Sequence, residues 1–309
     1  MTQFPATLVV GYDFSDTAAE AASVAFSLAE KIGARVRAVM VIERRYERRI
    51  AKHGHLFVDG RQEGDHESPA EWATEIVGVR LEEELRAQCP VGVQLDLEVA
   101  RGKPFGELLR VAQAAKAEMI LIGGTGLSRA EQWVLGSTAE RLARRSVIPT
   151  LVVRRGSIWE PRRILCPVDF SDAARLAFHK ALWLARLTEA TVRVLHVVAG
   201  TEARELETLG LLNRNDVKRY FEVTRMGAEQ QMERLVGEVA LEGLTLEQEI
   251  LYGRPHEKII EYAQQSEADL IVMGSLGRNQ ISDLLIGNTT ERVLRKMPCS
   301  VLTVKPEPG

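Results

Sequence analysis

The stretch TLVVGYDFSDTAAEAASVAFSLAEKIGARVRAVMVIE, residues 7–43, decides the fold, because the chain contains it twice in related form. The second version is RILCPVDFSDAARLAFHKALWLARLTEATVRVLHVVA, residues 163–199. Each version predicts an apolar strand, an Asp-Phe-Ser-Asp turn, a helix rich in Ala and Leu, and a second apolar strand. An internal repeat of this length indicates two copies of one domain.

The repeat continues to the end of each copy. ARGKPFGELLRVAQAAKAEMILIGG (100–124) is related to LYGRPHEKIIEYAQQSEADLIVMGS (251–275), and STAERLARRSVIPTLVVRR (137–155) to NTTERVLRKMPCSVLTVKP (288–306). The front blocks are 156 residues apart and the rear blocks 151, so the copies differ in length in their less similar middle. We expect domains at 1–155 and 161–309, joined through RGSIWEPR at 155–162.

Short apolar runs alternate with amphipathic helical segments in each copy, which is typical of a parallel α/β sheet. The predicted fold class is α/β, with two doubly wound, Rossmann-like, five-stranded parallel-sheet domains in tandem. The strands of the first copy are expected near 7–12, 35–41, 93–99, 118–123 and 149–154.

Local signals mark the helix ends. Ser15 and Ser171 are expected N-caps, each followed by an acidic residue that suits the positive helix end. Gly33 is expected to close the first helix, and Pro104 and Pro255 to begin the third helix of each copy. The charged segment 44–70 has no clear periodicity and is predicted to be a loop before a helix at 70–88.

Composition limits the possible functions. The formal net charge of −3 and the pI near 6.2 give no support to a nucleic-acid partner or an anionic membrane surface. The N-terminal stretch predicts no signal peptide, and no apolar run approaches the roughly 20 residues of a membrane span. Three widely separated cysteines argue against a disulfide framework, so the predicted location is the cytoplasm.

The glycine spacing is also repeated. GGTGLSRAEQWVLGST (123–138) and GSLGRNQISDLLIGNT (274–289) share the pattern G-x2-G-x9-G followed by a small polar residue. The first glycine falls where the fourth strand ends, and the last where the final helix begins. A helix N-terminus of this kind can bind an anion, and glycines let the backbone approach a sugar or phosphate. The alternative is that these glycines only serve turns and a helix cap.

Asp13 and Asp169 end the first strand of each copy. Ligands of open parallel sheets bind beyond the carboxyl ends of the strands. A carboxylate there could accept hydrogen bonds from an adenine amino group or a ribose hydroxyl. The alternative is that it only orders the strand-to-helix turn.

On these residues each half resembles a universal stress protein domain, and the chain resembles a tandem member of that family. Its ATP-binding subgroup carries G-x2-G-x9-G-[ST]. The resemblance implies that ribose and phosphates contact the glycines and the polar residues after them, and that adenine contacts the two aspartates and the backbone at Val41 and Val197. The glycine-motif residues are Gly123, Gly126, Gly136, Ser137 and Thr138 in the first copy, and Gly274, Gly277, Gly287, Asn288 and Thr289 in the second.

The resemblance also implies strand order 3-2-1-4-5 in each domain and pairing through the last strands, here within one chain, with a homodimer as a further possibility. Two positions depart from the pattern. Gly11 stands where the second copy has Pro167, which is expected to loosen the adenine end of the first site. Asn288 in place of Ser or Thr is expected to weaken the phosphate contact.

The predicted function is binding of ATP, with or without Mg²⁺, by a regulatory or stress-response protein with little or no hydrolysis. No acidic residue in the glycine loops recurs in both copies as a base for water. One rival is an enzyme, a slow ATP hydrolase or an ATP-using transferase. The other is a scaffold with purely structural glycines.

Other candidate groups are weaker. His53, His55 and His66, with Asp65, match no standard zinc spacing, and the basic run at 44–52 is expected to be a solvated face. His196 lies in an apolar strand, where Met40 holds the matching place, and is expected to be a hydrogen-bonded core residue. Trp133 in the first glycine loop could pack over a nucleotide or under the loop. The cysteines lack the neighbours of a thiol nucleophile.

Overall fold

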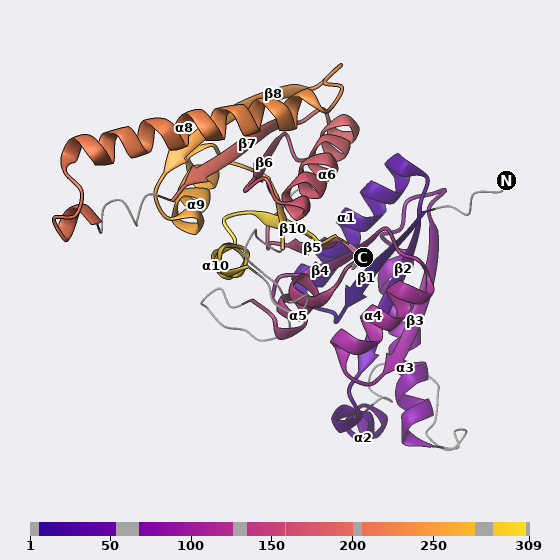
Figure 1. The fold of residues 1–309 in the computed structure, drawn as a ribbon. Helices are drawn as coiled ribbons and strands as arrows, with labels where there is room; N and C mark the ends of the chain where they lie inside the picture. Colours follow the sequence, from indigo (N-terminus) through magenta and orange to yellow (C-terminus); the bar gives the residue numbers. More distant parts are fainter. Residues whose placement is uncertain are drawn as a thin grey trace. The chain divides into compact units, whose positions relative to one another are not determined.

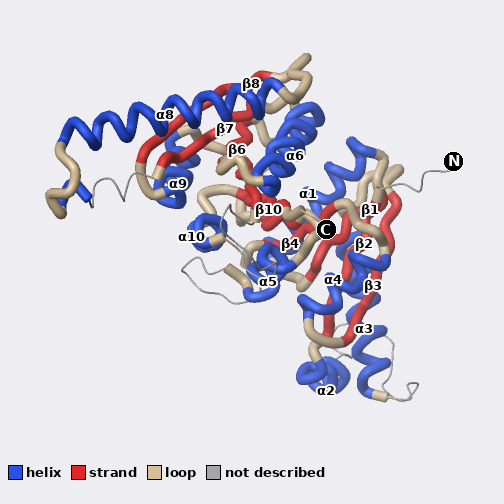
Figure 2. Tube along the Cα trace, in the orientation of Figure 1, coloured by secondary structure: helices blue, strands red, loops and turns tan. Residues whose placement is uncertain are grey.

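The computed structural model describes residues 6–53, 68–125, 135–157, 159–199, 206–275 and 287–306. It divides into two compact units, which we call unit 1 (Met1–Leu142 and Ile148–Trp159) and unit 2 (Ala143–Val147 and Glu160–Gly309). Figure 1 labels the elements of both units, and Figure 2 shows that each combines strands with surrounding helices.

Unit 1 alternates strands and helices along the chain. Its elements are β1 (Thr7–Tyr12), α1 (Asp16–Ile32), β2 (Arg35–Ile42), α2 (Arg44–His53), α3 (Pro69–Arg86), β3 (Gln94–Arg101), α4 (Pro104–Ala114), β4 (Met119–Gly123), α5 (Ser137–Arg145) and β5 (Thr150–Val153). Its strands are parallel and lie in the order β3-β2-β1-β4-β5. The predicted fold class and strand order are therefore confirmed.

Unit 2 repeats this arrangement. Its elements are β6 (Arg163–Pro167), α6 (Asp172–Thr188), β7 (Thr191–Val198), α8 (Arg214–Gly237), β8 (Thr245–Tyr252), α9 (Pro255–Gln265), β9 (Leu270–Gly274), α10 (Asn288–Lys296) and β10 (Ser300–Val304). The parallel order β8-β7-β6-β9-β10 is that of unit 1.

Helices cover both faces of the first sheet. Gly11 of β1 is paired with Ile122 of β4, and a Cβ atom added to Gly11 would lie 3.0 Å from Cδ1 of Leu108 in α4. A Cβ added to Gly123, the next residue of β4, would instead meet Thr17 of α1. Because successive residues of a strand point to opposite faces, α1 and α4 lie on opposite sides of the sheet.

The central strands form the core, and the outer strand β3 carries charged residues. All residues of β1 and β4 are buried, whereas β3 buries only Ala100.

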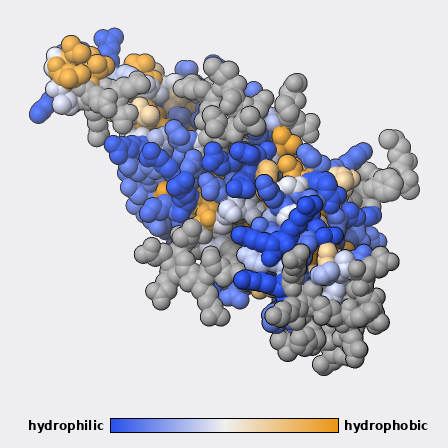
Figure 3. Space-filling model, turned by 90° about the horizontal axis from the view of Figure 1, so that it is seen from below, coloured by the Kyte–Doolittle hydropathy of each residue, from blue (hydrophilic) through white to orange (hydrophobic). Residues whose placement is uncertain are grey.

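In the view of Figure 3 the described surface is mostly hydrophilic with small apolar areas, and strongly exposed apolar side chains include Leu209 and Leu211. No helix in the described ranges is long and apolar enough to cross a membrane.

The predicted helix ends are confirmed. The hydroxyls of Ser15 and Ser171 accept hydrogen bonds from the backbone N–H groups of Ala18 and Ala174. Gly33 ends α1 in the left-handed conformation with φ of 66°. Pro104 and Pro255 occupy the first turns of α4 and α9. These caps satisfy helix-end groups that would otherwise lack partners.

The loop predicted at 44–70 is wrong over its first part, because α2 occupies Arg44–His53. Arg, Glu, Lys and Ala in this segment are good helix formers, and its few apolar residues hide the helical period. Ile50 nevertheless packs against buried Trp72 and Ile76 of α3. Tertiary packing of Ile50 thus supports a helix whose own sequence is mostly charged.

Candidate functional site

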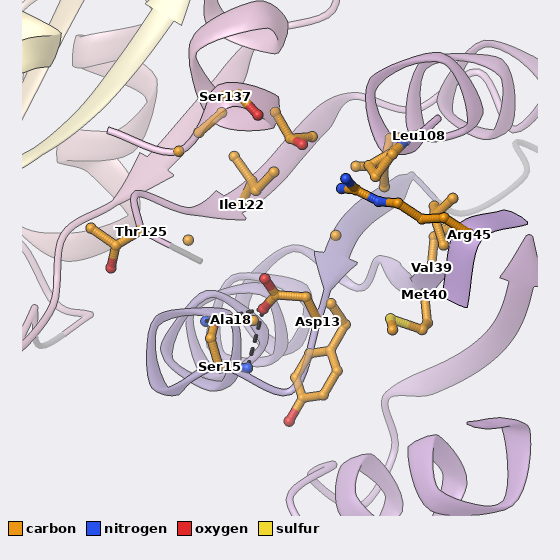
Figure 4. A pocket seen from close by; sticks show the side chains of 18 residues that line it. Asp13, Ser15, Ala18, Val39, Met40, Arg45, Leu108, Ile122, Thr125 and Ser137 are labelled. Carbon is orange, nitrogen blue, oxygen red and sulfur yellow. Dashed lines mark hydrogen bonds between the residues drawn. The ribbon is translucent and has the colours of Figure 1, made fainter. Parts of the chain in front are cut away.

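A cavity of about 400 Å³ lies at the carboxyl ends of β1, β2 and β4 in unit 1 (Figure 4). The strand order places β1 between β2 and β4, so this edge is where the two directions of winding diverge and where open α/β sheets bind ligands. The predicted site residues that line it are Asp13, Val41, Gly123, Gly136, Ser137 and Thr138. Gly126 lies outside the described residues.

The turn after β1 holds the Asp13 carboxylate. Its Oδ1 accepts hydrogen bonds from the backbone N–H of Ser15 at 3.1 Å and from the Ser15 hydroxyl at 2.5 Å. Within the described part of the chain no hydrogen bond to Oδ2 is found. Figure 4 shows the carboxylate directed toward the cavity. One oxygen therefore orders the turn, and the other is available to a ligand.

Phe14, the next residue, has a φ of 61°, a left-handed conformation that is rare for a bulky side chain. Its ring lies edge-on to Tyr12, with centroids 5.5 Å apart, and the Arg80 guanidinium lies 4.4 Å from its centroid. The hydroxyl of buried Tyr12 donates to Glu84 at 2.6 Å. Burial and this bond raise the pKa of Tyr12. Residues of α3 therefore hold the strained turn that orients Asp13.

Gly123 is required by close packing. A Cβ atom there would lie 2.5 Å from the Thr17 hydroxyl oxygen and 2.7 Å from its backbone carbonyl carbon. The Thr17 hydroxyl also donates to the carbonyl of Thr125. The missing side chain thus lets the end of β4 touch α1, while the residue also lines the cavity. On the side where a Cβ atom would project, Gly123 makes room for the backbone of α1 and not for a ligand.

The glycine loop returns to its start. The backbone N–H of Gly136 donates to the carbonyl of Gly124 at 2.8 Å, which brings the beginning of α5 beside the end of β4. Ser137 and Thr138, in the first turn of α5, line the cavity. Because the first N–H groups of a helix have no partner within it and carry partial positive charge, this end of the cavity favours an anion.

Sequence reasoning missed several residues of the cavity. Arg45 of α2, Met40 of β2 and Leu108 of α4 all contribute to its walls. Arg45 belongs to the basic run predicted to be a solvated face; two thirds of its side chain is exposed, as predicted, but it also lines the cavity, which the sequence did not indicate. The available signal was its position three residues after Ile42, where β2 ends at the binding edge.

Unit 2 places the matching residues in the same way. Asp169 Oδ1 accepts from the backbone N–H and the hydroxyl of Ser171 at 3.0 and 2.5 Å, and Phe170 has a φ of 63°. The Gly287 N–H donates to the Ser275 carbonyl at 2.8 Å. The predicted residues Val197, Gly274, Gly287, Asn288 and Thr289 lie at the ends of β7 and β9 and at the start of α10. Gly277 lies outside the described residues.

The first turn of α10 has no side-chain cap. Gly287 is its N-cap and makes no side-chain capping bond. The Thr290 hydroxyl donates to the carbonyl of Gly274 at 2.8 Å. A Cβ atom on Gly274 would lie 2.9 Å from the carbonyl carbon of Ala173 in α6. The second copy of the motif therefore combines the same close packing with an uncapped helix end.

The remaining candidate groups have other roles or cannot be placed. Nδ1 of His196 lies 2.7 Å from the carbonyl of Val168, which confirms the predicted hydrogen bond, but the residue is half-buried and does not belong to the core. Burial raises the pKa of the Cys166 thiol, which disfavours the nucleophilic thiolate. No group of potential metal ligands occurs in the described part of the chain. His53 is exposed there, whereas His55, Asp65, His66 and Trp133 lie outside it.

Comparisons with known proteins agree with this architecture. The model of the universal stress protein family matches residues 6–154 and again 160–305. A universal stress protein of Methanocaldococcus jannaschii is 31% identical over 153 residues, covering 47% of this chain and 94% of that protein. Universal stress protein E of Escherichia coli is 22% identical over 237 residues, covering 74% of this chain and 73% of that protein.

Solved structures extend the likeness over the whole chain. A universal stress protein from Archaeoglobus fulgidus superposes with a TM-score of 0.64 at 20% identity, covering 97% of this chain and 98% of that one. A putative universal stress protein from Pseudomonas aeruginosa gives a TM-score of 0.61 at 19% identity, with 97% and 93% covered. At these identities the superpositions support the fold, whereas the family follows from the two sequence matches. The chain belongs to the universal stress protein family and carries the family's domain twice.

Proposed function

We propose that this protein binds ATP at the carboxyl edge of each five-stranded sheet and acts as a stress-response regulator with little or no hydrolysis. The observation that carries the proposal is the cavity of unit 1, which is lined by six residues chosen from the sequence for nucleotide binding. Its volume of about 400 Å³ falls within the usual range for small-molecule sites.

The two ends of the cavity suit the two ends of a nucleotide. Oδ2 of Asp13 can accept a hydrogen bond from the adenine amino group, beside the backbone of Val41 at the end of β2. The first turn of α5, with Ser137 and Thr138, can donate to phosphate oxygens. A Mg²⁺ ion could accompany the triphosphate, and we assign no protein ligand to it.

Slow hydrolysis follows from the distribution of acidic groups. Among the described residues that line the cavity, Asp13 is the sole carboxylate, and one of its oxygens is bonded to Ser15. In the proposed orientation Asp13 lies at the adenine end, away from the phosphate that water would attack. A base and metal positioned for in-line attack are the usual requirements of efficient phosphoryl transfer.

The test is calorimetric titration of the full chain with ATP. The proposal expects two equivalents bound, one lost in Gly126→Asp, the other lost in Gly277→Asp, and both lost in the double variant. A carboxylate beside the phosphates should cost about 3 kcal/mol, which is more than a hundredfold in affinity. Circular dichroism without nucleotide checks folding. Parental binding of two equivalents by the double variant would contradict the proposal.

Turnover is tested separately with radiolabelled ATP. We expect less than roughly one ATP hydrolysed per minute, far below the usual range for enzymes. A faster rate that follows the protein through successive chromatography columns would instead support the ATP hydrolase.

We also propose that β5 and β10 pair with each other within one chain. These strands, TLVV and SVLTV, carry no charged residue, whereas the opposite outer strands β3 and β8 include several. An uncharged, unpaired edge promotes association, which proteins usually prevent by covering or charging it. A fragment truncated after residue 156 should therefore self-associate in sedimentation experiments. A fragment that stays monomeric at high concentration would contradict the pairing.

A further inference from the structure

Arg45 is a cation built into the wall of the unit 1 cavity. Its Nη2 donates to Oε1 of Glu43 at 2.8 Å, and its guanidinium carbon lies 4.8 Å from the centre of the Tyr46 ring. Two thirds of the side chain is still exposed. The guanidinium is thus directed by neighbours and also accessible to a ligand.

The helix that carries Arg45 is anchored at two further points. Glu47 accepts a hydrogen bond from Nε of Arg101, at the end of β3, at 2.9 Å. Ile50 packs against Trp72 and Ile76 of α3. These contacts hold α2 against β3 and α3, so the Arg45 side chain has a defined place beside the cavity.

Arg45 lies at the end of the cavity away from α5. It follows β2, which neighbours β1 on one side, whereas α5 follows β4, which neighbours β1 on the other. In Figure 4 Ser137 lies on one side of the cavity, and the Arg45 side chain extends from the opposite side, near Val39, toward Leu108. A nucleotide whose phosphates meet α5 would therefore present its base, not its phosphates, to Arg45.

The chemistry at this end suits a flat aromatic group. Val39, Met40 and Leu108 are apolar cavity residues, and Arg45 adds a planar, weakly hydrated cation. A guanidinium stacks favourably on the face of an aromatic ring, and it already lies near the Tyr46 ring. An approaching purine would extend this stack by one ring.

We propose that Arg45 stacks on the base of the nucleotide and thereby strengthens binding of the base at the unit 1 site. The inference rests on the proposed nucleotide function. In the repeat, the residue 156 positions after Arg45 is Thr201, which has no cation or ring and lies outside the described residues. The proposed stacking contact therefore concerns the first site.

The test measures binding of ATP and of adenosine by the full chain and by Arg45→Ala, with site 2 silenced by Gly277→Asp in both. Loss of a stacked cation should weaken both ligands about tenfold. Arg45→Lys, which keeps the charge and loses the plane, should fall between the parent and Arg45→Ala. Arg44→Gln is the matched control, because Arg44 is an exposed arginine next to Arg45 that does not line the cavity. This variant should bind both ligands as the parent does.

Each other outcome has a clear meaning. Weaker ATP binding with unchanged adenosine binding would place Arg45 on a phosphate and overturn the inference. Unchanged binding of both ligands in Arg45→Ala would overturn it while leaving the proposed function intact. Failure of the parental chain to bind either ligand would overturn both.

Discussion

The two units share a backbone frame and differ in the side chains that hold it. In both units the aspartate after the first strand accepts a hydrogen bond at 2.5 Å from the hydroxyl of the serine two residues later. The phenylalanine between them has a left-handed backbone conformation. The backbone N–H of the third motif glycine donates at 2.8 Å to the carbonyl of the residue after the first one. Each first glycine packs against the backbone of the first helix of its own unit, α1 for Gly123 and α6 for Gly274. The geometry of the binding edge is therefore the common feature.

The supporting contacts come from different elements. In unit 1 the hydroxyl of Thr17 in α1 donates to the carbonyl of Thr125, shortly after β4 ends. In unit 2 the residue that matches Thr17 is Ala173, which has no hydroxyl. The hydroxyl of Thr290 in α10 donates instead to the carbonyl of Gly274, at the end of β9. The left-handed Phe14 packs against Tyr12 and Arg80, while Phe170 packs against His196. Different side chains thus hold the same backbone contact between the two described ends of the glycine motif.

The largest effect is expected from filling the first glycine of each motif. Gly123→Ala and Gly274→Ala place a methyl group within 3 Å of helix backbone, which cannot move aside cheaply. Each should lower the free energy of unfolding by about 1–3 kcal/mol, as overpacking does. Gly123→Ala should cost more, because its nearest atoms are closer. Urea unfolding of the full chain measures both.

Matched controls lie in the same units. Gly106 in α4 and Gly227 in α8 have open space where a Cβ would be added. Alanine at either helix position should raise stability by about 0.5–1 kcal/mol. Equal effects at all four glycines would show that close packing does not distinguish the motif glycines.

The next effect concerns the two threonine anchors. Thr17→Val removes the bond to the Thr125 carbonyl, and Thr290→Val removes the bond to the Gly274 carbonyl. Each change leaves the methyl packing in place but leaves a carbonyl unpaired, so each should cost about 1–2 kcal/mol of stability. Each should also weaken ATP binding only in its own unit. Titration of the two variants, with site assignment by Gly126→Asp and Gly277→Asp, would reveal any crossed effect.

A smaller effect is expected where α1 and α6 end. Both helices close with a left-handed residue, Gly33 at φ of 66° and Glu189 at φ of 56°, and both donate to a carbonyl four residues earlier. Gly33→Ala should cost about 1 kcal/mol, since only the strain of the new side chain changes. Glu189→Gly should gain about 0.5 kcal/mol. Thermal melting that moves both variants in the same direction would contradict this account.

The sequence alone predicted the elements with strong local signals. Ser15, Gly33 and Pro104 each act within a few residues of their own position, so the helix ends were correct. The strand order came through the family resemblance. The α2 helix was missed because its support is Ile50 packing on Trp72, a contact between distant parts of the chain.

The candidate site was also predictable only where a residue belongs to a local pattern in the sequence. Asp13 and Ser137 could be chosen because the repeat marks them and because strand and helix ends meet at one edge. The packing role of Gly123 depends on Thr17, which no pattern around Gly123 contains. Arg45 was assigned to solvent because a charged run is usually solvated, and only the path of α2 brings it to the cavity.

The smallest predicted effect concerns a titratable group present in one unit. His256 opens α9, where the matching residue of unit 1 is Phe105. Nη1 of Arg292 lies 3.0 Å from Nε2 of His256, and because arginine can only donate, the imidazole must be neutral to accept. Burial, followed by the charges of Arg292 and Arg254, lowers the pKa of His256, while Glu257 opposes them.

The sign of the pH effect follows from this lowered pKa. The ordinary pKa of a histidine side chain is 6.5, and the pKa of His256 in the folded chain is lower. At pH values between the two, the unfolded chain binds a proton at His256 and the folded chain does not. The contribution to stability is therefore complete above pH 6.5 and is lost as the pH falls toward the folded-state pKa. His256→Phe, which copies unit 1, should flatten the stability profile below about pH 6.5. Urea midpoints at several pH values measure this slope, with His179→Phe on α6 as the comparison. An unchanged slope in His256→Phe would mean that the imidazole is equally protonated in the folded and unfolded chains, and that the contact with Arg292 does not persist in solution.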